Sequence, residues 1–299
     1  MPITARRLFL GPAAPADIDE RERAFYDSIK LANGTFKTTR PRRLEEITAV
    51  LVEHVGKRFR SCQVLDLGAS SGISTVELDD ALKRVGVLAQ VVGSDLAIDG
   101  FLVRLHRFLW VLADEHGNPL QYDLAGVALR PWRRRLDYVS GYWVVSALLN
   151  TLHARRYRRR VLDRIRGSGA ERVRLLTRRA VNRGVTFLRD DILEEPAPEL
   201  RGRFHVIRAA NLVNRAYFGD AQIRAIVRQI GARLVGPGAL VCVCRTASSG
   251  RVDGSIFVYR GGGEYDILAE AGRGSEVAEF FPQPAGTAIR GHGPGPMAP

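Results

Sequence analysis

Apolar positions along the chain follow two alternating patterns, continuous runs of strand length and helical spacings. A helical spacing follows the first run near residues 73–85, and another precedes the last run at residues 221–234. Strands that are buried on both faces have continuous apolar runs, and the order strand then helix is typical of parallel βαβ units. The pattern therefore predicts an α/β fold with a doubly wound, mostly parallel sheet. Its strands are expected at residues 64–66, 88–95, 185–190, 204–210 and 239–244.

The N-terminal part of the chain predicts helices alone. Apolar residues recur at helical intervals over residues 19–33 and again over residues 41–57. The second segment begins at Pro41, a residue that suits the first turn of a helix. We therefore expect a helical appendage over residues 1–57.

The C-terminal part predicts two further strands and then a tail. Two apolar runs surround Gly261, Gly262 and Gly263, which is typical of an antiparallel hairpin. Residues 282–299 are rich in proline and glycine and predict a disordered tail. The main domain is therefore expected over residues 58–281.

An inserted subdomain is expected at residues 101–180, where the alternation of strand and helix stops. Roughly 80 residues separate Asp95 from Val185, whereas a crossover between parallel strands needs about a dozen. Two strands are expected around the turn DEHGNP within this segment. The uncharged stretch at residues 138–152 lies between two arginine clusters and is too short to span a bilayer, which takes about 20 residues.

Positive charge is concentrated in the same insertion. The 299-residue chain has a net charge of +13, with 41 arginines and 4 lysines, and residues 101–180 hold 17 of the arginines but only 6 acidic residues. Three interpretations stay open. In the first, the insertion is a helix that packs on the core with its arginines in solvent. In the second, it covers an apolar substrate or lies on an anionic membrane surface. In the third, it is a nucleic-acid-binding surface.

The cysteines predict neither a disulfide framework nor a metal site. Cys242 and Cys244 fall on one face of an expected strand, and Cys62 stands far from both. We interpret all three as reduced core residues. The apolar stretch near the N-terminus is too short for a secretory signal, so a cytoplasmic protein is expected.

The stretch VLDLGASSGIS at residues 64–74 predicts a strand, a tight turn and a helix. Gly68 and Gly72 supply a permissive backbone that lets a ligand approach the turn closely. A nicotinamide dinucleotide fingerprint would have G-x-G-x-x-G here, whereas Asp66 precedes a G-x-S-x-G spacing with Ser70 at its centre. The acid favours a ligand with positive charge or hydroxyl groups near it. S-adenosylmethionine, which has an ammonium, a sulfonium and no phosphate, fits better than a dinucleotide.

This D-x-G-x-x-x-G stretch resembles the first motif of the class I S-adenosylmethionine-dependent methyltransferases. Three later features agree with the family in order: Asp95 ends the second strand, Asp190 and Asp191 follow the third, and FHVIRAANLVNRAYF contains the fourth. The resemblance covers residues 58–100 and 184–270. It implies a Rossmann-like methyltransferase fold with S-adenosylmethionine as cofactor.

The resemblance also implies roles for individual residues. Asp66 and Gly68 lie near the methionine part of the cofactor, and Asp95 binds the ribose hydroxyls. Asp191, or Asp190, faces the adenine. Ser70 stands where the family often has glycine.

Within this class, IRAANLVNRAYF followed by LVGPGALVCV is similar to the chemotaxis-receptor methyltransferase branch, in which an asparagine follows the fourth strand. Asn211 matches that position, whereas Ala210 stands where the branch usually has arginine. Receptor glutamates as substrate are therefore not implied. The predicted cofactor-binding residues are Asp66, Gly68, Ser70, Gly72, Asp95, Asp190, Asp191 and Asn211.

Methyl transfer is an in-line displacement, so positioning of the acceptor supplies much of the catalysis. Catalytic residues stay unassigned, because no motif selects a general base among His205, Tyr217 and the Asp190–Asp191 pair. His205 is more typical of a core residue. Arg208, which is unusual within a parallel strand, indicates either a nearby carboxylate of cofactor or substrate or the end of the strand.

The expected function is transfer of a methyl group to an unidentified acceptor, for which a small, apolar or lipid-like molecule is one class. No N-P-P-Y-like tetrapeptide of the amino-methylating nucleic-acid enzymes occurs. One alternative is a non-catalytic module of the same fold that binds a partner or nucleic acid through the Arg-rich insertion. A nicotinamide oxidoreductase is disfavoured by Asp66 and the glycine spacing. The methylated atom, the oligomeric state and the pathway stay open.

Overall fold

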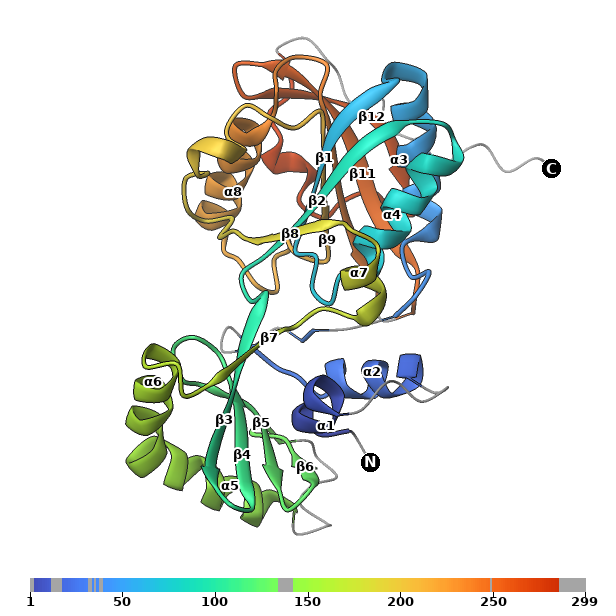
Figure 1. Ribbon diagram of the computed structural model, residues 1–299. Helices are drawn as coiled ribbons and strands as arrows, with labels where there is room; N and C mark the ends of the chain where they lie inside the picture. Colours follow the sequence, from blue (N-terminus) through green and yellow to red (C-terminus); the bar gives the residue numbers. More distant parts are fainter. Residues whose placement is uncertain are drawn as a thin grey trace, which may run out of the picture.

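The computed structural model describes residues 3–11, 18–31, 34, 36–37, 40–133, 142–247 and 249–284, so most of the expected tail lies outside the described residues. Two β-sheets organise the molecule, one in the upper half of Figure 1 and one in the lower half. We call the seven-stranded sheet the core sheet. The five-stranded sheet is called the inserted sheet, because its strands lie between residues 99 and 174, within the chain of the core sheet.

Five neighbouring strands of the core sheet are parallel, which confirms the mainly parallel α/β fold expected from the apolar runs. The spatial order of the whole sheet is β12-β11-β10-β9-β1-β2-β8. Strand order reverses between β1 and β9, as it does in doubly wound folds. The parallel strands are β1 (Ser61–Leu67), β2 (Leu88–Asp95), β8 (Thr186–Arg189), β9 (Val206–Ala210) and β10 (Leu240–Thr246).

The last two strands extend the core sheet at one edge. Strand β11 (Val252–Gly261) runs antiparallel to β10, and β12 (Glu264–Ala271) runs antiparallel to β11. Gly261, Gly262 and Gly263 all have positive φ at the turn between them. Glycine adopts this backbone without the steric cost that a Cβ would add.

Helices cover both faces of the core sheet (Figure 1). Helices α3 (Glu45–Arg58) and α4 (Ile73–Arg84) bury Leu51 and Leu78 against one face. Helix α8 (Asp220–Arg233) buries Ile226 against the other face, together with the short helix η4 (Ala278–Phe280). Two short helices complete this domain, α7 (Arg178–Asn182) and η3 (Pro198–Leu200).

The inserted sheet is antiparallel, with the order β6-β5-β4-β3-β7. The two strands expected around DEHGNP are β4 and β5. Its strands are β3 (Asp99–His106), β4 (Leu109–Ala113), β5 (Pro119–Leu124), β6 (Val127–Leu129) and β7 (Glu171–Arg174).

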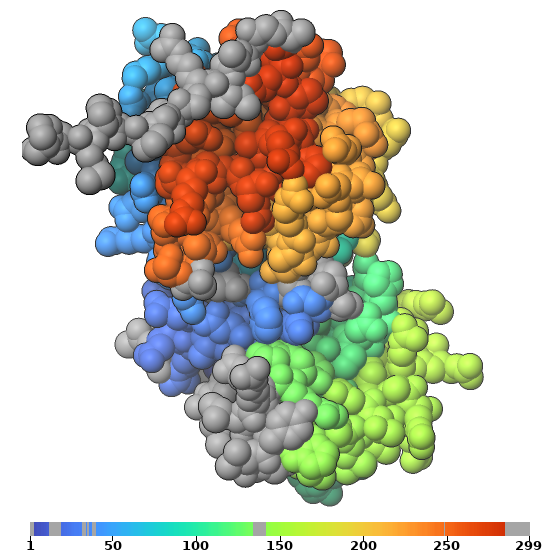
Figure 2. Space-filling view, turned by 180° about the vertical axis from the view of Figure 1, so that it is seen from behind, coloured from blue at the N-terminus to red at the C-terminus, as the bar shows by residue number. Residues whose placement is uncertain are grey.

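Helices also cover both faces of the inserted sheet. Helix α5 (Tyr142–Leu152), the π-helical turn η2 (His153–Tyr157) and helix α6 (Arg158–Arg166) run continuously across one face. Helices α1 (Ala5–Leu10) and α2 (Ile18–Tyr26) pack on the other face. The N-terminal helices therefore divide between the two sheets, with α1 and α2 on the inserted sheet and α3 on the core sheet. Figure 2 shows the blue N-terminal residues at the junction between the two halves of the molecule.

Helices α2 and α3 are both shorter than the apolar spacing predicts. Helix α2 ends at Tyr26, because the hydroxyl of Ser28 donates a hydrogen bond of 2.6 Å to the carbonyl of Phe25 and the chain turns there. Helix α3 begins at Glu45 rather than Pro41. The intervening turn includes Arg42 in a left-handed conformation with φ of 59°.

Candidate functional site

A cavity of about 430 Å³ opens at the carboxyl ends of the parallel strands, next to the point where strand order reverses. Ligands of doubly wound sheets bind at this place, because the loops that leave adjacent strands diverge there. We call it the strand-end cavity. Each of the five parallel strands contributes to its wall through residues at or just after its carboxyl end, among them Gly68, Ser70, Asp95, Asp191, Asn211 and Thr246.

The turn after β1 is held in an unusual backbone conformation. Gly68, Ser70 and Gly72 all have positive φ, at 73°, 56° and 84°. The amides of Gly68 and Ala69 both donate to the carbonyl oxygen of Ser94 at the end of β2. These bonds fasten the turn to the neighbouring strand, so Gly68 and Ser70 face the strand-end cavity.

Asp95 is positioned at the rim of the cavity by two backbone amides. The amide of Ser70 donates to Oδ2 at 2.7 Å, and the amide of Ala97 donates to Oδ1 at 3.0 Å. Each carboxylate oxygen can accept more than one hydrogen bond. Asp95 therefore keeps capacity to accept hydrogen bonds from a ligand such as a ribose diol.

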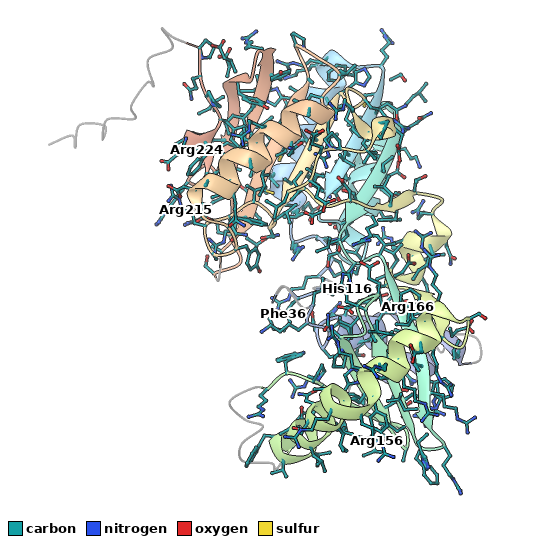
Figure 3. The ribbon with its side chains drawn as sticks, turned by 90° about the vertical axis from the view of Figure 1, so that its left-hand side faces the viewer. Phe36, His116, Arg156, Arg166, Arg215 and Arg224 are labelled. Carbon is teal, nitrogen blue, oxygen red and sulfur yellow. The ribbon has the colours of Figure 1, made fainter. Side chains whose placement is uncertain are left out.

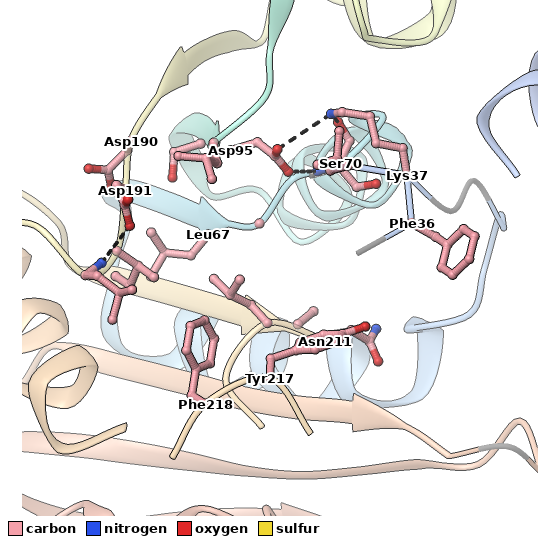
Figure 4. A pocket seen from close by; sticks show the side chains of 18 of the residues that line it. Phe36, Lys37, Leu67, Ser70, Asp95, Asp190, Asp191, Asn211, Tyr217 and Phe218 are labelled. Carbon is pink, nitrogen blue, oxygen red and sulfur yellow. Dashed lines mark hydrogen bonds and ion pairs between the residues drawn. The ribbon is translucent and has the colours of Figure 1, made fainter. Parts of the chain in front are cut away.

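Lys37 enters the same cavity from the N-terminal part of the chain. Its side chain is 1% exposed, and Nζ lies 3.6 Å from Oδ1 of Asp95 while donating to the carbonyl of Ser70 at 2.7 Å. Figure 4 shows these contacts as dashed lines on the side of the cavity opposite Tyr217. Burial lowers the pKa of Lys37, and the carboxylate of Asp95 offsets part of this effect.

Arg43, just before α3, supplies a second cation to the cavity wall. Among the described residues it forms no hydrogen bond or ion pair. Burial lowers its pKa, the charge of Arg208 adds to this effect, and the charge of Asp66 offsets part of it. A partly buried guanidinium without an anionic partner favours an anionic ligand, since planar bidentate pairing with a carboxylate is its strongest interaction.

Asp66 lies beneath the turn and does not line the cavity. Arg208 of β9 donates to both of its carboxylate oxygens at 2.8 Å, and the hydroxyl of Thr75 donates to Oδ2 at 2.6 Å. Arg208 also donates to Thr48 of α3 and to the carbonyl of Ser74 of α4. A ligand could reach Asp66 only by displacing these groups, so the carboxylate that Arg208 indicated belongs to the protein itself.

Asp190 and Asp191 are neighbours in sequence but lie in different environments. Arg233 of α8 donates to both oxygens of Asp190, at 2.8 and 3.2 Å, in a buried ion pair. The carboxylate of Asp191 accepts a hydrogen bond from the amide of Leu193 at 2.9 Å and otherwise faces the cavity. Figure 4 shows both acids beside Asp95, on the side away from Lys37. Asp191 is therefore the acid of this pair that can bind a ligand.

Asn211 joins the ends of β9 and β10. Its side-chain oxygen accepts from the amide of Thr246 at 2.7 Å, and its amide nitrogen donates to the hydroxyl of that residue at 3.3 Å. Asn214 is buried and caps the following turn, accepting from the amides of Ala216 and Tyr217. Asn211 lines the cavity, whereas Asn214 supports the loop that carries Tyr217 into it.

Gly72 is required for packing rather than for the cavity. A Cβ at this position would lie 2.6 Å from Cβ of Ala180 and 2.8 Å from the ring of Phe187. The carbonyl of Ser71 accepts hydrogen bonds from both the amide and the hydroxyl of Thr177. Helix α7 therefore covers the N-terminus of α4, and the helix end that holds phosphate in dinucleotide-binding folds is closed.

The predicted general-base candidates also separate. His205 lies just before β9, at the end of the sheet away from the cavity, where Nδ1 accepts from the amide of Gln63. Tyr217 lines the cavity and is half exposed. Among these candidates, Tyr217 and Asp191 can reach a molecule in the cavity, and His205 cannot.

A second cavity of about 480 Å³ lies beside the first and shares Leu31 and Leu96 with it. We call it the junction cavity, because it lies between the core sheet and the inserted sheet. Ile98 and Phe101 add to its apolar lining. Its polar rim contains two ion pairs, Asp99 with Arg172 and Glu115 with Arg189, and the exposed ring of His116. Figure 3 shows His116 and Phe36 at the waist of the molecule.

Lys37 and Arg43 are the charged residues of the strand-end cavity that the sequence did not single out. Lys37 lies in a polar segment without periodicity, and Arg43 is a polar position at the start of the helix expected over residues 41–57. The approach of both residues to the strand ends is long-range in sequence. One signal was present: Lys37 is one of only 4 lysines in a chain that uses arginine at its 41 other basic positions.

No protein-family profile and no curated protein matches the chain. Solved structures similar to it include the citrinin polyketide synthase CMeT domain (16% identity, TM-score 0.32), the S-adenosylmethionine-bound amino pentose methyltransferase CalS10 from Micromonospora echinaspora (13%, 0.32) and the [4+2]-cyclase SpnF (13%, 0.29). They match 67%, 74% and 68% of this chain, which spans 34%, 66% and 47% of theirs. Likeness at this level assigns no activity to the chain.

Proposed function

We propose that the strand-end cavity binds S-adenosylmethionine and that the protein is a methyltransferase. The observation that carries this proposal is the contrast between Asp95 and the N-terminus of α4. Asp95 faces the cavity with free acceptor capacity, whereas the helix end that a pyrophosphate would need is buried under α7. A cofactor with ribose hydroxyls and no phosphate suits this arrangement, and a nicotinamide dinucleotide does not.

The remaining polar groups of the cavity complement the other parts of the same molecule. Arg43 offers an unpaired cation near the ends of β9 and β10, where it would hold the cofactor carboxylate. Asp191 lies after β8, on the far side of Asp95 from the ends of β9 and β10. Its free carboxylate oxygen would accept a hydrogen bond from the adenine amino group there. Leu67, Ile192 and Leu193 add apolar lining for the adenine ring.

Lys37 and Asp95 would act together on the ribose. A hydroxyl that donates to the Asp95 carboxylate keeps lone pairs that can accept from the Lys37 ammonium. Asp66 and Asp190, by contrast, are proposed to hold the site together through Arg208 and Arg233 without contacting the cofactor. The similarity to the chemotaxis-receptor branch stays a sequence prediction that rests on Asn211.

The acceptor would bind in the junction cavity. Its walls include Leu31 and Leu96 of the strand-end cavity, so an acceptor there approaches the cofactor directly. The apolar lining and charged rim favour a small molecule with an apolar body and one polar group. S-adenosylmethionine, when bound, supplies an activated methyl group. The protein contributes by holding cofactor and acceptor in line and by excluding water.

Equilibrium dialysis with two ligands tests the proposal. S-adenosylmethionine carries the amino-acid carboxylate, whereas 5′-methylthioadenosine keeps the ribose and adenine but lacks that group. Asp95→Asn should weaken both ligands about tenfold or more, because an amide accepts fewer hydrogen bonds than a carboxylate. Arg43→Met should weaken S-adenosylmethionine alone.

The matched control is Asp266→Asn on β12, whose carboxylate pairs with Arg260 at the surface and should leave both affinities unchanged. If wild-type protein retains neither ligand, the non-catalytic module becomes the better account. If Arg43→Met weakens both ligands equally, the assigned orientation of the cofactor is wrong.

A further inference from the structure

We call the inserted sheet, together with the helices that cover it, the inserted domain. One continuous helix over residues 142–166, comprising α5, η2 and α6, forms its outer surface. We call it the outer helix. Its inner side chains, including Ser146, Leu149, His153 and Val161, are buried against the inserted sheet. The opposite side chains face away from the molecule, as Figure 3 shows for the length of this helix.

The N-terminal half of the outer helix exposes aliphatic side chains. Val144, Val145, Leu148 and Leu152 are 51%, 41%, 59% and 37% exposed. Val144 and Val145 are adjacent, and Leu148 and Leu152 follow them at intervals of three and four residues, so the four side chains form one stripe along the helix. A stripe of this kind has no role in the core of the inserted domain. Contiguous exposed apolar side chains mark surfaces that bind a partner or a membrane.

The C-terminal half of the outer helix continues the surface with arginines. Residues 153–166 hold seven arginines and one acid, Asp163. Five of these arginines are exposed and form no hydrogen bond or ion pair with the described part of the chain: Arg155, Arg156, Arg159, Arg160 and Arg166. Cations that are not neutralised by the protein favour an anionic partner.

We propose that the outer helix binds the surface of an anionic lipid bilayer. The aliphatic stripe of α5 enters the boundary between headgroups and acyl chains, and the arginines of η2 and α6 contact lipid phosphates. Within the described residues, no helix is long and apolar enough to cross a membrane. In this proposal the outer helix lies along the membrane surface. This proposal is independent of the function assigned to the strand-end cavity.

The aliphatic stripe favours lipid over nucleic acid. A nucleic-acid surface uses basic and polar side chains on phosphates, and aromatic side chains for stacking on bases. Val144, Val145 and Leu148 offer neither interaction and would stay exposed to water on such a partner. A bilayer accommodates both halves of the outer helix at once.

Co-sedimentation with lipid vesicles tests the proposal. Full-length protein is mixed with vesicles of phosphatidylcholine alone or with phosphatidylglycerol added. We expect sedimentation with the anionic vesicles only. Each arginine near an anionic surface strengthens adsorption about fivefold, so Arg156→Glu with Arg159→Glu should lower the partition coefficient at least about twentyfold. Leu148→Asp should lower it about tenfold or more, because a charge replaces an inserted aliphatic side chain.

The control is Arg224→Glu with Arg228→Glu on α8, which makes the same change in net charge on a different exposed helix face and should leave sedimentation unchanged. Circular dichroism checks that each variant is folded, and Val145→Asp provides a second test of the stripe. The proposal is overturned if wild-type protein stays in solution with anionic vesicles. It is also overturned if both stripe variants sediment like wild type. Binding of double-stranded DNA in place of vesicles would assign the surface to nucleic acid.

Discussion

The ammonium nitrogen of Lys37 lies 3.6 Å from a carboxylate oxygen of Asp95, although 58 positions of sequence separate the two residues. The same nitrogen donates to the carbonyl of Ser70 in the turn after β1. One buried cation therefore joins the N-terminal segment, the glycine turn and the acid at the end of β2. This junction lies at the centre of the proposed cofactor site.

Lys37 should give the folded protein a characteristic pH dependence. Burial lowers its pKa below the ordinary value of 10.5, so the folded state binds fewer protons than the unfolded state between the two pKa values. The destabilising contribution of the buried ammonium is therefore present below the folded pKa and is relieved as the pH rises toward 10.5. Urea unfolding should show wild type gaining stability relative to Lys37→Met over that range. Lys57→Met, on the surface of α3, should track wild type at every pH.

The buried ion pair between Asp66 and Arg208 should make the core sheet sensitive to the loss of either partner. Removing one partner leaves the other as a buried, uncompensated charge, so Arg208→Met should cost about 3–5 kcal/mol of unfolding free energy. The double variant Asp66→Leu with Arg208→Met should recover part of that loss. Arg201→Met, which breaks an exposed pair with Glu195, should change stability little. A small effect of Arg208→Met would show that Asp66 is satisfied in some other way.

Gly72 should be sensitive to substitution because of space as well as backbone conformation. Gly86 has a similar φ of 76° but open space around the position of a Cβ. Gly86→Ala should therefore cost only the backbone term, about 1–2 kcal/mol. Gly72→Ala should cost more, because the new Cβ overlaps Ala180 and Phe187. Equal losses in chemical denaturation would contradict the close packing of α7 on this turn.

His153 should make the inserted domain sensitive to acid. Its Nε2 lies 2.8 Å from the carbonyl of Gly117, its Nδ1 is buried without a hydrogen-bond partner among the described residues, and burial lowers its pKa below 6.5. The stability that depends on the neutral ring is present above 6.5 and is lost as the pH falls through the folded pKa. Thermal unfolding should show a smaller acid-induced loss in His153→Gln than in wild type. His106→Gln, at an exposed position, should behave like wild type.

The sequence predicted the sheet better than the site, for a physical reason. Buried parallel strands carry apolar runs, and these local patterns identified β1, β2, β8, β9 and β10 in order. The division of α1, α2 and α3 between two sheets left no local pattern, because amphipathic spacing shows that a helix has a partner but not which one.

The acids of the site show the same limit. Asp66, Asp95 and Asp190 all stand at strand ends, and the sequence treats them alike. Only the structure shows that Asp66 and Asp190 are engaged by arginines from β9 and α8, whereas Asp95 faces the cavity. Which acid receives an internal partner depends on long-range packing.

The most direct test of the central claim is a crystal structure of the protein with S-adenosylhomocysteine, the product of the proposed reaction. The account predicts electron density in the strand-end cavity, with the ribose hydroxyls on Asp95, the adenine beside Asp191 and the carboxylate on Arg43. Density elsewhere, or the ligand bound in the opposite orientation, would contradict the proposed site. A cavity that stays empty at saturating ligand would contradict the methyltransferase assignment itself.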